Sequence, residues 1–210
     1  MIRRSVRKRF HTVYWQPPSV ELSAPVIFVP NHHGWFDGYL MFHVVKALNT
    51  SCLDWIQEFD AFPWFEKIGG MPYPLNDLKR RGVTVKKTIR MMNEKGLSLL
   101  LFAEAELHYP PELLPFGKAL ETVADKVPNS IVMPVAIHYE MSMHERPEAF
   151  IGFGNPVEKG PGLAERTREA VLEVLTRLRS DAKEQKSTFS VLAKGTPDVN
   201  ERWDLRKWRK

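Results

Sequence analysis

Short apolar runs alternate with amphipathic segments along most of this chain, and this alternation restricts the possible folds more than any other feature. Continuous apolar runs such as "VIFV" and "LSLLLF" indicate buried strands, whereas apolar residues at a period near 3.6 indicate helices. Alternating strands and helices are typical of a sheet with helices packed on its faces. We therefore predict an α/β fold.

The pattern also gives approximate boundaries. Strands are predicted at 26–29, 51–56, 97–102, 131–139 and 149–153, and 71–75, which carries two prolines, suits only an edge strand or an extended loop. Helices are predicted at 37–48, 63–68, 83–93, 118–125 and 163–183, with "DLKRRG" as a basic turn before the third of them. Asp37 is expected at the N-cap of the first helix.

Composition narrows the cellular setting. Cys52 is the only cysteine, so an intrachain disulfide is impossible and a reducing compartment is expected. Apolar runs fall short of the roughly 18 residues that a membrane-spanning helix needs, and the basic N-terminus lacks the apolar region of a secretory signal. We expect a cytoplasmic protein without a transmembrane segment.

Both ends of the chain are basic and aromatic. "MIRRSVRKRF" precedes Tyr14 and Trp15, and the C-terminal "ERWDLRKWRK" contains Trp203 and Trp208. Such ends are simply solvated in many proteins, and otherwise attract anionic lipid or nucleic acid. We expect these ends to bind the anionic surface on the inner face of the membrane, and we expect no nucleic-acid partner.

Candidate catalytic residues are concentrated in "NHHGWFD", where the first predicted strand is followed by a predicted helix. Functional residues of α/β sheets gather at the carboxyl ends of strands. Asp37 can accept from one nitrogen of His32 and leave the other nitrogen free to take a proton from a hydroxyl group. No serine or cysteine nucleophile lies beside the pair, which favours direct transfer to a second substrate over a covalent intermediate.

The same stretch resembles the Asn-His-x4-Asp motif of the glycerolipid and lysophospholipid acyltransferase family, whose best-known members acylate 1-acylglycerol 3-phosphate. Three further blocks follow in the order of that family. "IGGMPYPLNDLKRRG" resembles the second motif, "LLLFAEAEL" resembles the third with Glu104 at its glutamate, and "IVMPVAIHYE" resembles the fourth with Pro134 after an apolar strand.

The resemblance implies a single glycerol-3-phosphate acyltransferase-like α/β domain over 1–210, with a mixed, mostly parallel sheet flanked by helices. Its motifs cover about 25–156, between a basic N-terminal segment (1–18) and a C-terminal helix with a basic tail (163–210). It also implies an acyltransferase of phospholipid biosynthesis in which acyl-CoA or acyl-carrier protein is a co-substrate, with no bound cofactor and no metal.

The resemblance assigns roles to particular residues. His32 is the general base, and Asp37 orients it while the acceptor hydroxyl attacks the thioester. Asn31, His33, Gly34 and Pro134 match or fill motif positions, and Gly34 replaces a serine that is common there. The acceptor pocket is expected to include residues of the second and third motifs and a nearby lysine, namely Lys79, Arg80, Arg81, Glu104, Glu106 and Lys118.

The third motif departs from the family in one respect. Leu107 stands where the family has an arginine that is thought to hold the phosphate of the acceptor, and Glu106 adds a negative charge. A neutral, amine-bearing or glycosylated lipid alcohol suits this charge better, unless Lys118 or the 79–81 cluster supplies the phosphate contact.

Three other interpretations of the pair remain. A hydrolase would use His32 and Asp37 to activate water, with His33 as a possible metal ligand, although adjacent histidines on an extended chain point to opposite sides. A non-catalytic lipid-binding protein would have the acyltransferase fold without the acyl-transfer activity. In the third, His32 is a loop histidine with a structural hydrogen bond.

Overall fold

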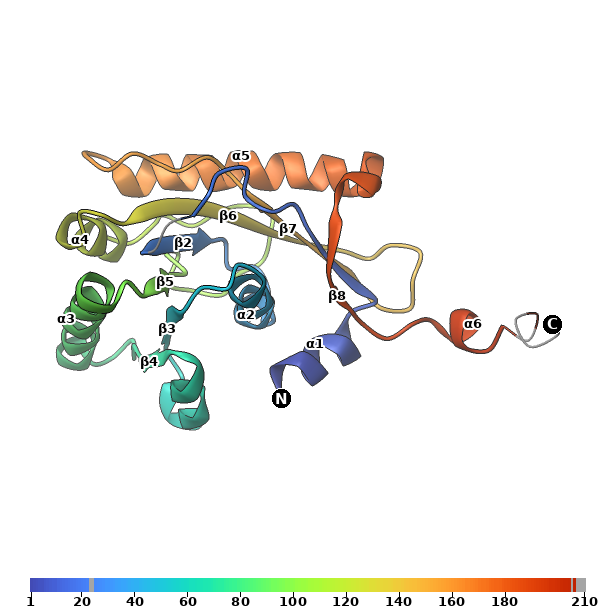
Figure 1. Cartoon of the computed structure of the whole chain (residues 1–210), viewed down its shortest axis with the longest axis horizontal. Helices are drawn as coiled ribbons and strands as arrows, with labels where there is room; N and C mark the ends of the chain where they lie inside the picture. The colour runs from blue at the N-terminus through green and yellow to red at the C-terminus, as the bar shows by residue number, and fades with distance from the viewer. Residues whose placement is uncertain (23–24, 205, 207–210) are drawn as a thin grey trace.

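A computed structural model describes residues 1–22, 25–204 and 206 of the chain. Its centre is an eight-stranded sheet in the order β4-β3-β5-β2-β6-β7-β1-β8 (Figure 1). The β1–β8 and β6–β7 pairs are antiparallel and the other neighbouring pairs are parallel, so the predicted mixed, mostly parallel α/β sheet is confirmed. The strands are β1 (Thr12–Trp15), β2 (Val26–Pro30), β3 (Cys52–Ile56), β4 (Gly70–Pro72), β5 (Ser98–Leu100), β6 (Ile131–Glu140), β7 (Glu148–Phe153) and β8 (Ser190–Lys194).

Helices cover both faces of the sheet, and Figure 1 shows α5 running along β6 and β7. They are α1 (Ile2–Arg9), α2 (Asp37–Ala47), α3 (Leu78–Lys95), α4 (Ala119–Lys126), α5 (Leu163–Glu184) and α6 (Val199–Arg202), with 3-10 turns η1 (Phe59–Ala61), η2 (Pro63–Ile68) and η3 (Lys186–Thr188). Within the described part of the chain, no helix combines the length and hydropathy required to cross a membrane.

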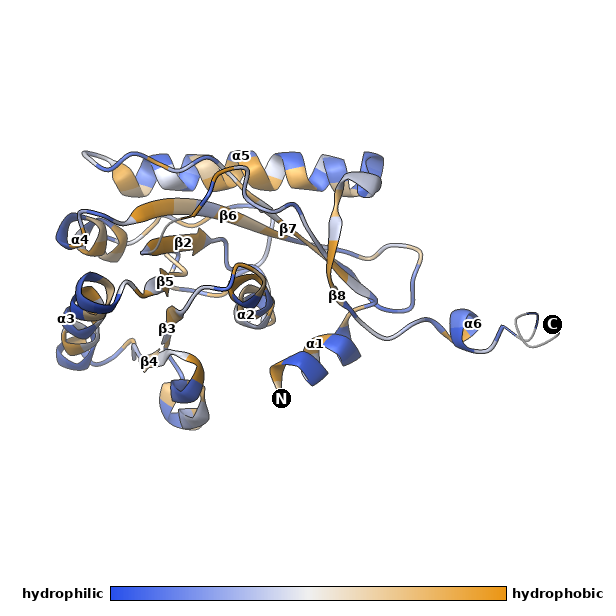
Figure 2. Ribbon diagram, in the orientation of Figure 1, coloured by the Kyte–Doolittle hydropathy of each residue, from blue (hydrophilic) through white to orange (hydrophobic). Residues whose placement is uncertain are grey.

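Strand β2 is apolar throughout because it is covered on both sides. Val26 and Phe28 belong to the hydrophobic cluster that includes α1 and α2, whereas Ile27 and Val29 belong to the cluster that includes α3 and α4. Alternate residues of a strand face opposite sides of the sheet, which explains this division. Figure 2 shows the hydrophobic colouring concentrated on the central strands, while the helices carry hydrophilic residues.

One predicted N-cap and one predicted helix start are wrong. Asp37 is the first residue of α2 rather than its N-cap, and its side chain does not cap the helix. Helix α3 begins at Leu78, five residues before the predicted start, because the Asp77 side chain accepts a hydrogen bond from the Arg80 backbone N–H. The basic "DLKRRG" segment is therefore the N-cap and first turn of a helix, not a turn between elements.

The sheet also extends beyond the strands predicted from the sequence. Strand β1 pairs with β7 and β8, and α1 packs against the core through Ile2 and Val6. Residues 1–18 were predicted only as a basic segment, without this helix and strand. The predicted C-terminal tail likewise contains β8 and α6, while Trp208 lies outside the described residues.

Candidate active site

His32 lies in the loop between β2 and α2, beside Asp37. The side chain of Asp37 is fully buried, and His32 Nδ1 lies 3.0 Å from Asp37 Oδ2. Since an ionised carboxylate only accepts hydrogen bonds, this contact places the imidazole proton on Nδ1. Nε2 is then the nitrogen that can accept a proton, on a side chain that is about one quarter exposed.

Asp37 is held by two further donors. The Gly34 backbone N–H donates to Oδ2 at 2.8 Å, and the Tyr139 hydroxyl donates to Oδ1. Burial, and then the nearby Asp37 carboxylate, raise the pKa of Tyr139 well above its usual value, so the hydroxyl keeps the proton that it donates. Tyr139 was missed in the sequence analysis because it lies on β6, far along the chain.

The missing side chain of Gly34 makes room for this tyrosine. A Cβ at Gly34 would lie 2.4 Å from Cε2 and 2.6 Å from the hydroxyl oxygen of Tyr139. The two groups could not both occupy their present positions. Glycine at this motif position therefore accompanies a tyrosine that reaches Asp37.

Asn31 and His33 hold the loop in place through hydrogen bonds to Ile137 of β6 and to the Glu112 carbonyl. The buried Asn31 amide donates to the Ile137 carbonyl at 3.1 Å and accepts from the Ile137 N–H at 2.7 Å. His33 Nδ1 lies 3.1 Å from Asn31 Nδ2, and its Nε2 lies 2.9 Å from the Glu112 carbonyl oxygen. Burial lowers the pKa of His33, which agrees with a neutral ring that accepts at Nδ1 and donates at Nε2.

Glu104 joins the loop after β5 to the backbone of the candidate base. It is buried, and its Oε1 accepts from the His32 backbone N–H at 2.7 Å. Its Oε2 accepts from the Leu114 N–H at 2.7 Å and lies 2.5 Å from His108 Nε2. These contacts fix the position of His32, and His108 is a partner that the sequence analysis missed.

One ligand atom each from His33, Glu104 and His108 lies within 4.8 Å of the others, a spacing that could hold a metal ion. Both carboxylate oxygens of Glu104 and both ring nitrogens of His33 are held by groups outside this trio, however, namely backbone N–H groups, a backbone carbonyl and the Asn31 amide. His32 is not part of this group, so a metal there would not bind the candidate base.

His32 opens onto a cavity of about 600 Å³. Its wall is largely apolar and aromatic, and includes Trp35, Tyr39, Phe42, Trp55, Phe62, Phe65, Leu100 and Phe102. Trp35 is 61% exposed at the rim, and the His32 ring packs against Phe102 with centroids 4.3 Å apart. The cavity thus offers a long apolar surface that ends beside an imidazole.

Asp54 is a carboxyl group in this wall that was not identified from the sequence. Burial raises its pKa to about 7, and the positive charge that His32 can carry opposes that rise. Lys46, Glu58 and Lys67 also line the cavity. Its polar groups are therefore acidic as well as basic.

The four predicted acceptor-binding cations are not among the described residues that line the cavity. Arg80 forms a two-point ion pair with Asp60 at 2.6 and 2.7 Å, and the Arg81 guanidinium carbon lies 4.6 Å from the centroid of the Tyr73 ring. Lys79 and Lys118 are exposed at the starts of α3 and α4.

The other predicted positions divide in a similar way. Glu106 is exposed and its neighbours Ala105 and Leu107 line the cavity, whereas Pro134 is buried in β6 opposite Val29 of β2. The structure thus brings together His32, Asp37, Gly34 and Glu104 and leaves the four cations apart from them.

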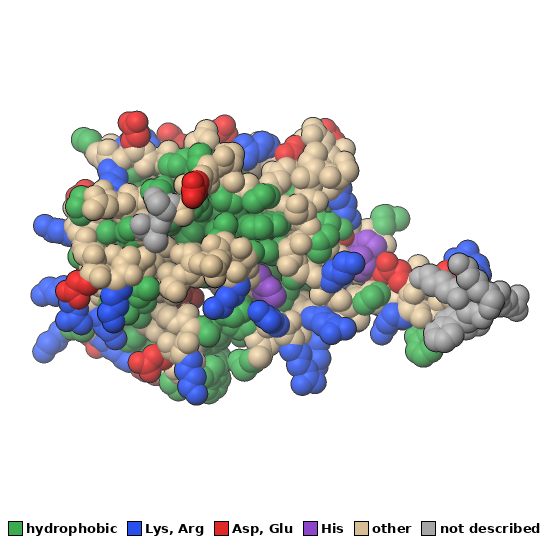
Figure 3. Space-filling view, in the orientation of Figure 1, with side chains coloured by type: hydrophobic (Ala, Val, Ile, Leu, Met, Phe, Trp, Pro, Cys, Tyr) green, Lys and Arg blue, Asp and Glu red, His purple; other side chains and the backbone are tan. Residues whose placement is uncertain are grey.

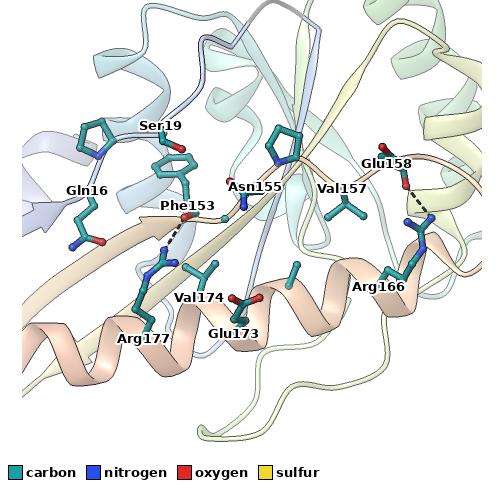
Figure 4. A pocket seen from close by; sticks show the side chains of 14 residues that line it. Gln16, Ser19, Phe153, Asn155, Val157, Glu158, Arg166, Glu173, Val174 and Arg177 are labelled. Atoms are coloured by element: carbon teal, nitrogen blue, oxygen red, sulfur yellow. Dashed lines mark hydrogen bonds between the residues drawn. The ribbon is translucent and has the colours of Figure 1, made fainter.

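A second hollow of about 650 Å³ lies between α5 and the segment after β7 (Figure 4). Arg166 and Arg177 of α5 donate to the carbonyl oxygens of Glu158 and Phe153 at 2.8 and 3.0 Å. None of its lining residues also lines the His32 cavity. Arg177 thus holds α5 to β7, and Arg166 holds it to the segment that follows β7.

Comparisons with known proteins point in one direction. A family model described as acyltransferase matches residues 11–138. The fold is similar to the crystal structure of the 1-acyl-sn-glycerophosphate (LPA) acyltransferase PlsC from Thermotoga maritima, with a TM-score of 0.56 and 20% sequence identity over 83% of this chain and 73% of that chain. No curated protein matches this sequence significantly.

Proposed function

This chain belongs to the acyltransferase family, and we propose that it moves a fatty acyl group from acyl-CoA or acyl-carrier protein to a hydroxyl of a lipid acceptor. The observation that carries the proposal is the His32–Asp37 pair at the wall of an apolar cavity, with Nδ1 held by Asp37 and Nε2 left as the proton acceptor. An acyl chain matches the apolar walls, and a general base matches an alcohol acceptor.

The reaction is a single acyl transfer in which each proton has a place to go. Nε2 of His32 takes the hydroxyl proton as the acceptor oxygen attacks the thioester carbonyl carbon. The tetrahedral intermediate then expels the thiolate, and the imidazolium returns its proton to the sulfur. Asp37 stabilises the imidazolium between these two steps, because its buried carboxylate lies 3.0 Å from Nδ1.

The charges around the cavity favour an acceptor without a phosphate near the reacting hydroxyl. Lys46 and Lys67 in the cavity wall are offset by Asp54 and Glu58, and Arg80 and Arg81 are engaged elsewhere, so the wall carries no excess of positive charge. We therefore expect a neutral, amine-bearing or glycosylated lipid alcohol to be acylated faster than a lysophosphatidate.

Peripheral contact with an anionic membrane completes the proposal. Helix α1 carries Arg3, Arg4, Arg7, Lys8 and Arg9 and contacts α2, and Ile2 lines the cavity. Figure 3 shows basic side chains gathered along the rim that contains α1, beside hydrophobic ones. Basic groups next to exposed aromatic side chains such as Trp35 suit the surface of an anionic bilayer.

The test is acceptor-dependent thiol release from long-chain acyl-CoA or acyl-carrier protein. The parent, His32→Ala and the control His43→Gln are compared on lysophospholipids, glycolipids and aminolipids. His43 lies on α2 but is not among the residues that line the cavity. Release that requires an acceptor and is lost only in His32→Ala supports the proposal.

Three results would count against it. Release without any acceptor would indicate thioester hydrolysis. Silence with both donors across the panel, combined with unchanged lipid binding in His32→Ala, would indicate a lipid-binding protein. Equal activity in the parent and His32→Ala would remove His32 from the chemistry.

A further inference from the structure

A second group of histidines and carboxylates lies away from the acyl-transfer cavity. We call it the terminal histidine cluster, and it consists of His11, His144, Glu148, Asp198 and Glu201. His11 directly precedes β1, His144 lies between β6 and β7, Glu148 begins β7, and the last two lie at α6 (Figure 1). None of the five lines the His32 cavity. Three distant parts of the sequence therefore meet at one place.

Glu148 forms the inner side of the cluster. Its carboxylate is buried, accepts from Lys186 Nζ at 2.6 and 2.8 Å, and accepts from the Ser142 hydroxyl at 2.7 Å. Burial opposes its ionisation, but these hydrogen bonds outweigh burial and lower the pKa of Glu148. Oε1 of this carboxylate lies 3.6 Å from His11 Nδ1 and 3.7 Å from His144 Nε2.

The other nitrogen of each imidazole points to a carboxylate near the C-terminus. His11 Nε2 lies 3.0 Å from Glu201 Oε2, and His144 Nδ1 lies 2.7 Å from Asp198 Oδ2. The two rings stack with centroids 3.5 Å apart at an angle of 8°. One ligand atom from each of these four residues lies within 4.8 Å of the others.

We propose that the terminal histidine cluster binds one divalent transition-metal ion of the zinc class. His11, His144, Asp198 and Glu201 supply two nitrogens and two oxygens, a set that suits tetrahedral zinc. The Glu148 carboxylate lies 3.6 and 3.7 Å from the outer nitrogens of the two rings, and His11 Nδ1 also contacts the Thr12 hydroxyl at 3.1 Å; carboxylates and hydroxyls in such outer positions commonly accompany histidine ligands of metals.

Binding requires a limited rearrangement. Metal–ligand bonds of about 2.0–2.2 Å need the four atoms to move closer together, and the stacked rings must splay so that each lone pair points at the ion. Protons now shared between the imidazoles and the carboxylates would leave as the ion binds. The ion would hold α6 against β1 and the β6–β7 connection, so its role is structural.

The test uses the full chain after treatment with a chelator. Co²⁺ is added while the visible d–d absorption is recorded, Zn²⁺ is used as competitor, and bound metal per chain is measured after dialysis. Thermal unfolding with and without Zn²⁺ gives an independent readout. We expect one ion per chain, tetrahedral cobalt bands and a higher Tm with Zn²⁺.

Variants connect the signal to these residues. Asp198→Asn should weaken binding at least tenfold, because asparagine can still cap α6 but offers no carboxylate. His11→Gln/His144→Gln should abolish the cobalt bands, and His43→Gln should bind as the parent does. If the double variant fails to fold, Asp198→Asn decides. A parent without bound ion, or binding unchanged in Asp198→Asn, would overturn the proposal and leave the cluster as an ion-pair network.

Discussion

The molecule contains two histidine–aspartate pairs whose inner contacts are alike and whose surroundings differ. His32 Nδ1 lies 3.0 Å from Asp37 Oδ2, and His144 Nδ1 lies 2.7 Å from Asp198 Oδ2. The remaining nitrogen of His32 belongs to a ring in the wall of an apolar cavity, whereas that of His144 lies 3.7 Å from the buried Glu148. The two histidines therefore differ in what lies beside the nitrogen that the aspartate does not hold. For the candidate base His32 it is the cavity, and for the candidate metal ligand His144 it is a carboxylate.

The first expected difference between the pairs is the largest. His32→Ala should lower the rate of acyl transfer by about 10²–10⁴-fold, because it removes the proton acceptor. His144→Ala should leave the rate within about threefold of the parent. Initial rates of thiol release at saturating donor and acceptor measure both. An equal loss in the two variants, with both chains folded by circular dichroism, would contradict the division of roles.

Asp37→Asn should have the next largest effect on turnover. An amide at this position can donate to Nδ1, which favours the tautomer with its proton on Nε2 and removes the charge that stabilises the imidazolium. We expect kcat to fall about 10²-fold with little change in KM. A change confined to KM would show that Asp37 acts on substrate binding instead.

Gly34→Ala should weaken the first pair through Tyr139. The new Cβ would overlap the tyrosine ring, and such overpacking costs about 1–3 kcal/mol of stability. Tyr139→Phe loses only the hydrogen bond to the Asp37 carboxylate, which is worth about 1.5–3 kcal/mol because the acceptor is charged. If Gly34→Ala acts by displacing Tyr139, the double variant should lose less activity than the sum of the two single changes. Additive losses would show that the two act independently.

The smallest effect on turnover is expected at Asp54, which instead changes the pH dependence of stability. Its pKa is about 7 in the folded chain against an ordinary value of 3.8, so the folded state holds its proton over a range where the unfolded state releases it. This residue therefore lowers stability progressively as pH rises from about 4 to 7, with no further change above that range.

Asp54→Asn removes this dependence. We expect the variant to be more stable than the parent at pH 8, and the difference to close towards pH 4. Denaturant midpoints across this range measure it, with Asp125→Asn on α4 as a matched control at an exposed aspartate. A constant difference at every pH would show that Asp54 titrates normally.

The sequence predicted the central strands well because each is a continuous apolar run. It did not predict α1, β1 or β8. Basic residues dominate α1 and hide its buried Ile2 and Val6, and β8 has only partly buried or exposed residues, so neither shows a strong apolar pattern. Five basic residues among the seven positions 3–9 thus concealed a helix that packs on the core.

The candidate site could be predicted where its residues are close in sequence. His32 and Asp37 are five positions apart, and spacing alone suggested their contact. Tyr139 lies 102 positions from Asp37, so no local pattern predicted it. That Arg80 and Arg81 bind the acceptor stays a prediction. Neither residue lines the cavity, because α3 starts earlier than predicted and the two side chains contact Asp60 and Tyr73 instead.

The Asn31 side chain affects where the backbone that carries His32 can leave the sheet. Its side chain satisfies both the N–H and the C=O of Ile137, groups that in a parallel ladder would bond to the backbone of two different residues of β2. Strand β6 therefore keeps its hydrogen bonds past the point where β2 has ended. The backbone of residues 31–34 is released from the pairing register of the sheet. An amide side chain thus supplies the donor and the acceptor that a longer strand would have supplied, and this lets the chain leave the sheet at the position where the candidate base is needed.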